Sequence, residues 1–260
     1  MTQRLFLYID ILGFKDLVRS KSIVPELYRR IDKLHVHTDN AFTCIVFSDT
    51  ILVYSHDGWL DHPREAIMWL IEFAQDLFYS VISLDIHFRA YITQGEFDHQ
   101  RLEHVEAYYG DALIECYERE KLIKCTGVFL DEKLAKHSHI FFLTKYDDYS
   151  FFVHVMQNLD AVSFGYSEYP ISGFELEQTG MEWWTAYPLH YLRNIYQHAN
   201  DQSHPLEVRE KYQNAWKMIS SRHEGLCRRL VESNFVFGDV IKLDWTEKLA
   251  RIGTKEGAFR

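Results

Sequence analysis

Two short apolar segments each carry a single aspartate, and this pair constrains the fold more than any other feature of the chain. Residues 5–14 read Leu-Phe-Leu-Tyr-Ile-Asp-Ile-Leu-Gly-Phe, and residues 47–55 read Phe-Ser-Asp-Thr-Ile-Leu-Val-Tyr-Ser. An unpaired buried carboxylate is costly, so an aspartate at a strand end or in a hairpin needs a partner. Asp10 and Asp49 together offer the oxygen ligands that a hard divalent cation prefers. The pattern therefore predicts metal-assisted chemistry on a phosphate.

The composition favours one compact domain, or one domain with an extension. The chain has 260 residues, 47% of them hydrophobic and 15% aromatic, which is enough to build a buried core. Its net charge of −10 argues against a nucleic-acid partner, because proteins that bind nucleic acid present basic surfaces. The charge does not exclude a nucleotide, since magnesium or manganese can neutralise the phosphates.

We expect a cytoplasmic protein with no membrane partner. The sequence has no charged-then-apolar leader, and no apolar run approaches about 18 residues. The four cysteines show no C-x-x-C spacing and are expected to be reduced.

The fourteen histidines are expected to be solvated or to cap helices rather than to bind zinc. His35 and His37 are close in sequence, as are His99 and His104, but neither pair has further ligands at zinc-site spacing nearby.

Hydrophobic periodicity predicts alternating strands and helices over about the first 160 residues. Strands are expected at 4–10, 41–47, 50–55, 85–95, 104–109, 126–130, 139–144 and 150–156. Helices are expected at 14–19, after Pro25, and at 64–82 and 111–123. The polar residues 96–103 are expected to form a loop, and Ser48-Asp49 a tight hairpin connection.

The C-terminal part has a different character, with helical patterns at 181–200 and 205–233. We therefore divide the chain into a first domain, 1–178, and a helical C-terminal extension, 179–260. The order of elements in the first domain fits the α+β class, with an antiparallel or mixed sheet and helices on one face.

Four short segments resemble the motifs of the class III nucleotidyl cyclases, the family of adenylate and guanylate cyclases. They are Asp10-Ile11-Leu12-Gly13-Phe14, the hairpin Ser48-Asp49 (where the family usually has glycine before the aspartate), the strand from Arg89 to Gly95, and Tyr109-Gly110-Asp111-Ala112. They occur in family order across about residues 4–130, and together they are more specific than any one alone. The resemblance implies a ferredoxin-like class III cyclase catalytic domain over 1–178.

The resemblance also implies roles for these residues. Two divalent cations, Mg²⁺ or Mn²⁺, would be held by Asp10, Asp49 and the Ile11 carbonyl while the ribose 3′-hydroxyl of a nucleoside triphosphate attacks its α-phosphorus. Backbone amides from Ile11 through Leu12 and Gly13 to Phe14 would cradle the phosphates at a helix N-terminus. The simpler alternatives are a strand-end carboxylate at Asp10, a turn cap at Asp49 and an ordinary strand-to-helix turn.

The family works as a head-to-tail dimer, so the resemblance implies a homodimer with shared active sites. One protomer supplies the metal aspartates and the other supplies an asparagine and an arginine, four residues apart on the helix after Gly-Asp-Ala. Direct alignment places Ile114 and Glu118 at these positions. A shift of one residue places Glu115 and Arg119 there and keeps the spacing. We predict that Arg119 is catalytic, with an exposed helix arginine as the alternative.

The predicted base pocket is apolar where purine cyclases read the purine edge. The two base-reading positions fall at Ile45 and Ala107, whose side chains cannot hydrogen-bond a base. A purine edge would be left unpaired against them. Thr43, on the same strand face as Ile45, and Arg89 could contact the base, although Arg89 could instead be a structural ion-pair residue.

Either the base is not a purine or the enzyme has lost specificity. The Ser48-Asp49 variant, the Gly110-Asp111-Ala112-Leu113 turn and the aromatic-rich C-terminal extension look most like the pyrimidine cyclases of bacterial antiphage signalling, which make cyclic UMP or cyclic CMP. We expect UTP in preference to CTP. A purine cyclase, an inactive nucleotide-binding module and an interaction protein built on the C-terminal helices are the rival interpretations.

Overall fold

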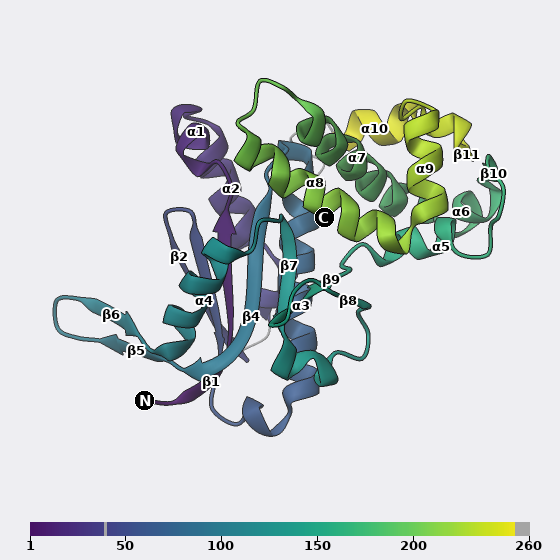
Figure 1. Ribbon diagram of the computed structural model, residues 1–260. Coiled ribbons are helices and arrows are strands. Elements are labelled where there is room, and N and C mark those ends of the chain that lie inside the picture. The colour runs from purple at the N-terminus through teal and green to yellow at the C-terminus, as the bar shows by residue number, and fades with distance from the viewer. Residues whose placement is uncertain (39–40, 253–260) are drawn as a thin grey trace. The chain divides into compact units, whose positions relative to one another are not determined.

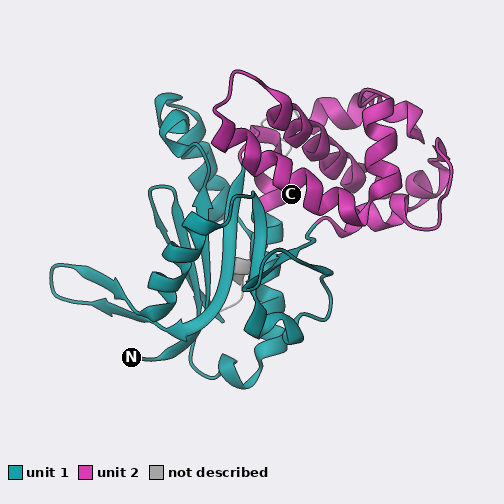
Figure 2. Cartoon of the chain, viewed as in Figure 1, with its two compact units in different colours: residues 1–77, 87–155 teal, residues 78–86, 156–260 magenta. Residues whose placement is uncertain are grey.

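The computed structural model describes residues 1–38 and 41–252 (Figure 1). The chain forms two compact units (Figure 2). The first comprises 1–77 and 87–155, and the second comprises 78–86 together with the chain from 156 onward. Residues 253–260, the end of the predicted helical extension, lie outside the described residues. The division into domains after residue 178 stays a prediction.

A mixed sheet is the centre of the first unit. In the described residues it has seven strands in the order β2-β3-β1-β4-β7-β9-β8. The strands are β1 (Gln3–Ile11), β2 (Phe42–Phe47), β3 (Thr50–Ser55), β4 (Phe88–Glu96), β7 (Gly127–Asp131), β8 (Leu143–Lys145) and β9 (Ser150–Val153). β4 and β7 pair in parallel and the other neighbours pair antiparallel. This mixed sheet with its helices confirms the predicted α+β class.

The first four strands and their helices have the ferredoxin-like arrangement. Helices α1 (Phe14–Arg19) and α2 (Ile23–Asp32) follow β1, and α3 (Pro63–Val81) connects β3 to β4. β1 lies between β3 and β4 and is antiparallel to both. A βαββαβ chain with this strand order is ferredoxin-like, as expected from the sequence.

β1 has two different faces because successive side chains of a strand point to opposite sides. Leu5, Leu7 and Ile9 are fully buried on the face behind which α3 runs (Figure 1). Tyr8 and Asp10 lie on the other face, which α4 (Asp111–Leu122) covers in part by packing on β4 and β1. Helices therefore lie on both faces of the sheet, and the expectation of helices on one face is wrong. We call this second side the α4 face of the sheet.

Several segments of the first unit differ from the sequence-based expectation. The helix expected after Pro25 begins at Ile23, and the strand expected at 139–144 begins only at Leu143. β5 (Asp98–Arg101), in the expected loop, pairs antiparallel with β6 (Glu106–Tyr109) as a separate two-stranded sheet. The residues of β5 are polar, so this strand lacks the apolar alternation by which strands are recognised. β6 lies within the strand expected at 104–109. The strand expected from residue 85 begins at Phe88, because a 3₁₀ turn at Ile82–Leu84 and a left-handed Asp85, with φ of 52°, precede it.

The second unit is mainly helical. Its helices are α5 (Asp160–Ser163), α6 (Phe174–Thr179), α7 (Met181–Asn200), α8 (Leu206–Arg222), α9 (Glu224–Glu232) and α10 (Thr246–Ile252). The short strands β10 (Ile171–Ser172) and β11 (Ile241–Lys242) pair in parallel. The helix expected at 205–233 is two helices, because His223 (φ −116°, ψ 43°) leaves helical geometry between α8 and α9.

One helical segment among the described residues, Pro63–Leu84, is long and apolar enough to cross a membrane by length and composition. Of its most apolar window, 61% is buried inside the protein, and the core helix of a soluble protein gives the same pattern. The cytoplasmic location stays a prediction.

Gly110, the residue before α4, should tolerate no side chain. Its φ is 146°, and a Cβ would lie 2.2 Å from the Glu96 carbonyl oxygen and 2.7 Å from the Phe97 Cα. These backbone atoms cannot move aside as a side chain could, so Gly110→Ala should lower the free energy of unfolding by about 2 kcal/mol or more in urea titrations. Gly58→Ala is the control. Gly58 has φ of 90°, but a Cβ at this position would have no neighbouring atom within 4 Å. Because of backbone strain alone, this variant should lose only about 1 kcal/mol in free energy of unfolding. Equal losses in the two variants would contradict the steric argument.

Candidate active site

The pairing of β1 with β3 brings Asp10 and Asp49 to one end of the sheet. Asp10 is the cross-strand partner of Thr50, so Asp49 is the residue immediately before that partner. The Ile11 N–H donates to the Asp49 carbonyl oxygen at 2.9 Å, which ties the end of β1 to the β2–β3 turn. Both aspartates are half-buried. Two carboxylates at such neighbouring, partly open positions can share a cation.

The turn that carries Asp49 has a left-handed residue at Ser48. Phe47 pairs with Thr50, so Ser48 and Asp49 form a two-residue connection, and Ser48 has φ of 56°. Glycine is favoured at such a position, since other residues adopt it at a cost of about 1–2 kcal/mol. The Tyr28 hydroxyl, from α2, donates to the Ser48 carbonyl oxygen at 3.0 Å and holds the turn.

Arg89 fixes the Asp10 carboxylate from the other side. Asp10 and Arg89 are cross-strand partners of β1 and β4, and Arg89 Nη2 donates to Asp10 Oδ2 at 3.0 Å. The same guanidinium pairs with Glu120 of α4, and Nη1 donates to the Ile123 carbonyl oxygen at 2.6 Å. Burial lowers the pKa of Arg89, and the Asp10 charge opposes that shift. Arg89 therefore has a structural ion-pair role; its predicted contact with a base remains a prediction.

Tyr8 lies on the α4 face two residues before Asp10. Burial raises the pKa of its phenol, and the Asp10 and Asp49 charges add to this increase, while a side-chain hydrogen bond with Thr50 opposes it. The phenol is therefore neutral at physiological pH and is subject to both negative charges.

A pocket of about 650 Å³ opens on the α4 face beside these residues. Tyr8, Thr50 and Ile45 contribute from the sheet, and Ile114 and Glu118 contribute from α4. The remaining lining residues are Phe47, Leu52, Tyr108, Leu113, Tyr117 and Lys121. Most of these side chains are apolar, which is typical of sites that enclose the flat ring of a ligand.

The predicted base-pocket residues occupy different parts of this region. Ile45 lines the pocket, and Thr43 lies on the same sheet face, because the two pair with Leu52 and Tyr54. The Thr43 hydroxyl is hydrogen-bonded to His56 Nε2 at 2.8 Å. Ala107 lies on β6 opposite Gln100 and is half-buried, and its neighbour Tyr108 lines the pocket.

The predicted phosphate cradle is a strand-to-helix turn around Gly13, whose φ is 70°. The Leu12 N–H donates to the His87 carbonyl oxygen at 2.9 Å, and the Ile11 N–H is bound to Asp49 as described above. Gly13 is exposed and Phe14 is the first residue of α1. The amides that face a ligand at this turn would therefore be those of Gly13 and Phe14.

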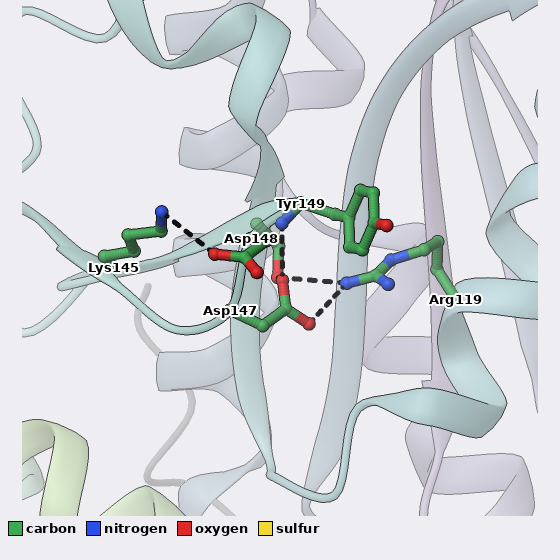
Figure 3. A network of polar contacts seen from close by, with 6 residues as sticks. Arg119, Lys145, Asp147, Asp148 and Tyr149 are labelled. Carbon is green, nitrogen blue, oxygen red and sulfur yellow. Dashed lines mark hydrogen bonds and ion pairs between the residues drawn. The ribbon is translucent and has the colours of Figure 1, made fainter.

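Arg119 lies on a different side of α4 from Ile114 and Glu118. Its Nη2 donates to Asp147 Oδ2 at 2.6 Å and to Ser150 Oγ at 3.3 Å (Figure 3). The guanidinium carbon is 5.8 Å from the Tyr91 ring centroid and 5.1 Å from that of Tyr149. Burial tends to lower the pKa of Arg119, but Asp147 outweighs it and raises that pKa. The direct alignment with the cyclase motif selects Ile114 and Glu118, which line the pocket. The alignment shifted by one residue selects Arg119, which lies in this ion-pair network. The catalytic role of Arg119 stays a prediction.

Several residues of the site were not predicted from the sequence. Tyr8 and Thr50 carry a usable signal, since the period of two along β1 and β3 puts both on the face of Asp10. Glu120 and Asp147, the partners of the two arginines, carry none, because they come from a later helix and loop whose packing the sequence pattern does not reveal.

Comparisons with solved structures find nucleotide cyclases as similar folds. The adenylyl cyclase CyaB from P. aeruginosa is 10% identical, with a TM-score of 0.44 over 58% of this chain and 93% of that chain. The guanylyl cyclase Cya2 is 14% identical, with a TM-score of 0.42 over 58% and 91%. The guanylyl cyclase domain of the RhoGC fusion protein from the aquatic fungus Blastocladiella emersonii is 14% identical, with a TM-score of 0.41 over 59% and 96%. No protein-family model and no curated protein matches the sequence. We therefore base the proposed function on the residues of this chain.

Asp147 should stabilise the protein through Arg119, and neighbouring Asp148 provides a matched control. The Asp147 side chain is 32% exposed, whereas that of Asp148 is 88% exposed and pairs with Lys145 (Figure 3). Asp147→Asn should lower the free energy of unfolding by about 2 kcal/mol, because it leaves a buried guanidinium without its counter-charge. Asp148→Asn should cost less than about 0.5 kcal/mol.

The pH dependence of this difference provides a second check. Partial burial would raise the pKa of Asp147, but the Tyr149 amide and the Arg119 guanidinium outweigh it and lower that pKa. A carboxyl with a lowered pKa stabilises the fold at neutral pH and loses this contribution in acid. The difference between the wild type and Asp147→Asn should therefore shrink as the pH falls through the lowered pKa. Denaturant titrations at several pH values measure it, and a constant difference would argue against an ion pair.

Proposed function

We propose that this chain is a nucleotidyl cyclase that converts a pyrimidine nucleoside triphosphate, UTP in preference to CTP, into the 3′,5′-cyclic nucleotide and pyrophosphate. The observation that carries the proposal is the convergence of Asp10 and Asp49 at one end of the sheet, beside an open apolar pocket. The four resembling segments of the sequence support the same activity. The product would be a second messenger, and a role in antiphage defence follows from the resemblance alone.

The residues present fit two divalent cations, Mg²⁺ or Mn²⁺. The donor set would be the carboxylates of Asp10 and Asp49 and the main-chain carbonyl of Ile11, all of them hard oxygen ligands. Asp10 and Asp49 lie at neighbouring positions at one end of the sheet, where their carboxylates would share the cations. When bound, such ions lower the pKa of the attacking hydroxyl and neutralise the phosphates.

The protein's own groups would position the substrate. The amides of Gly13 and Phe14 would donate to phosphate oxygens at the start of α1. The pocket wall formed by Ile45 would receive the base. In the reaction, the ribose 3′-oxygen forms a bond to the α-phosphorus, the bond to the β-phosphate oxygen breaks, and the hydroxyl proton passes to solvent. Nothing in this scheme requires a side-chain nucleophile.

The proposed role of Arg119 requires an exchange of partners. Its guanidinium would have to leave Asp147 in order to balance the charge that develops on the α-phosphate. Asp147 therefore competes with the substrate for this arginine. The alternative function, an inactive nucleotide-binding module, is favoured by the same contact and by the absence of an asparagine at position 114 or 115.

A homodimer with shared sites is part of the proposal. Phe47, Ile114 and Tyr117 line the pocket and are exposed in the single chain. Exposed apolar groups around a pocket are typical of a surface that a second copy covers. The metal aspartates of one protomer and the α4 residues of the other would then face the same substrate, as the family resemblance implies.

Asp10→Asn or Asp49→Asn should lower the cyclisation rate by at least about 10²-fold, since each removes a charged ligand shared by the two cations. The measurement is product formation from each of the four nucleoside triphosphates with Mn²⁺, resolved by chromatography. Asp16→Asn is the control, because Asp16 lies close by on α1 but its side chain is 77% exposed and pairs only locally with Arg19.

Circular dichroism must show that both variants remain folded, because Asp10→Asn also weakens the ion pair with Arg89. A folded variant that retains near-normal activity would refute the metal assignment. A wild-type protein that converts none of the four nucleotides under these conditions would refute the cyclase function itself.

The specificity constant for UTP and CTP should exceed that for ATP and GTP by roughly one to two decades. A purine edge left unpaired against Ile45 costs about 1–3 kcal/mol. The four constants are compared in one buffer with Mn²⁺. If ATP or GTP is converted best, the pyrimidine specificity is wrong and the protein is a purine cyclase with an unusual pocket.

A further inference from the structure

Two histidines of the second unit turn ring nitrogens toward each other. His198 lies near the end of α7, and His204 lies in the connection to α8. His198 Nδ1 and His204 Nε2 are 3.2 Å apart. Between them in the sequence, Asp201 points Oδ2 toward His204 Nε2 at 3.8 Å, while its Oδ1 accepts the Ser203 N–H at 2.8 Å. The segment thus reads His-x-x-Asp-x-x-His, with the His204 ring near both the His198 ring and the Asp201 carboxylate.

The other nitrogen of His198 is held by a carboxylate. Asp85, in the short segment of the second unit that precedes β4, accepts from His198 Nε2 at 2.8 Å. Asn194, one turn earlier on α7, donates to the second oxygen of Asp85 at 2.9 Å and fixes the carboxylate. The Tyr212 ring stacks on the His198 imidazole with centroids 4.8 Å apart. These contacts favour a proton on Nε2 and a lone pair on Nδ1, directed at His204.

This arrangement has the chemistry of a zinc site. Zinc-bound imidazoles usually donate their other nitrogen to a carboxylate, as His198 does to Asp85. Zinc–nitrogen distances of about 2.0–2.1 Å in a tetrahedral site place two ligand nitrogens roughly 3.3–3.4 Å apart. The separation of 3.2 Å between the two rings is close to this value.

We propose that His198 Nδ1, His204 Nε2 and Asp201 Oδ2 bind one zinc ion, with water as the fourth ligand and Asp85 as the carboxylate that orients His198. Two imidazoles and one carboxylate suit zinc better than magnesium or manganese, which prefer oxygen ligands. The site lies entirely within the second unit and does not depend on the cyclase proposal. It would join the end of α7 to the connection that leads into α8.

Metal titration of the full chain tests this site. The protein is first stripped with a chelator and then titrated with Co²⁺, whose visible spectrum distinguishes four-coordinate from six-coordinate sites, and with Zn²⁺ by calorimetry. We expect one equivalent of Co²⁺ with a four-coordinate spectrum. His198→Gln and His204→Gln should each weaken binding at least about 100-fold, and Asp85→Asn by about 10–100-fold.

His104→Gln is the matched control, because the His104 side chain is 84% exposed in the β5–β6 hairpin connection of the first unit. This variant should bind cobalt and zinc as the wild type does. His204→Gln lies outside the helices, so it keeps the test valid if His198→Gln fails to fold. Absence of stoichiometric uptake by the wild type, or uptake that survives in His198→Gln and His204→Gln, would overturn the proposal and leave a simple hydrogen bond between the rings.

Discussion

β1 pairs with β3 on one edge and with β4 on the other, and the whole proposed site depends on this double pairing. Asp10 has Thr50 as its partner on one side and Arg89 on the other. The pairing therefore places Asp49 beside Asp10, and it places the Arg89 guanidinium where it pairs with the Asp10 carboxylate. Because the register of a strand fixes which face each side chain takes, a slip of one residue would move Asp10 into the apolar layer with Ile9.

The two buried arginines of the α4 face show how the fold accommodates charge. Arg89 lies on β4 and Arg119 lies on α4. Each forms an ion pair with a carboxylate from a distant segment of the chain. A buried guanidinium without a counter-charge would be costly, whereas these pairs connect β1, α4 and the β8–β9 turn. The site is thus bordered by ion pairs on its inner side and by apolar side chains around its opening.

The sequence allowed most of the sheet to be predicted, because apolar alternation and turn residues mark β1, β2, β3 and β4 directly. It also placed Asp10 near the end of a strand and Asp49 in a tight hairpin turn, where the structure has them. β5 could not be predicted, since a polar strand leaves no periodic signal. The partners Glu120 and Asp147, and the meeting of His198 with Asp85, depend on packing between segments that are far apart in the chain. No local pattern encodes such contacts.

The two carboxylate partners of Arg89 have a thermodynamic implication. One guanidinium nitrogen contacts Asp10 on β1 and Glu120 on α4, and the opposite side of the same helix carries Ile114 and Glu118 into the pocket. A cation at Asp10 would weaken its attraction for Arg89 and leave Glu120 as the stronger partner. Binding of the ion at Asp10 and the position of α4 at the pocket would then be energetically coupled. By linkage, a ligand of the pocket that binds more tightly when the ion is present would raise the affinity for the ion by the same factor.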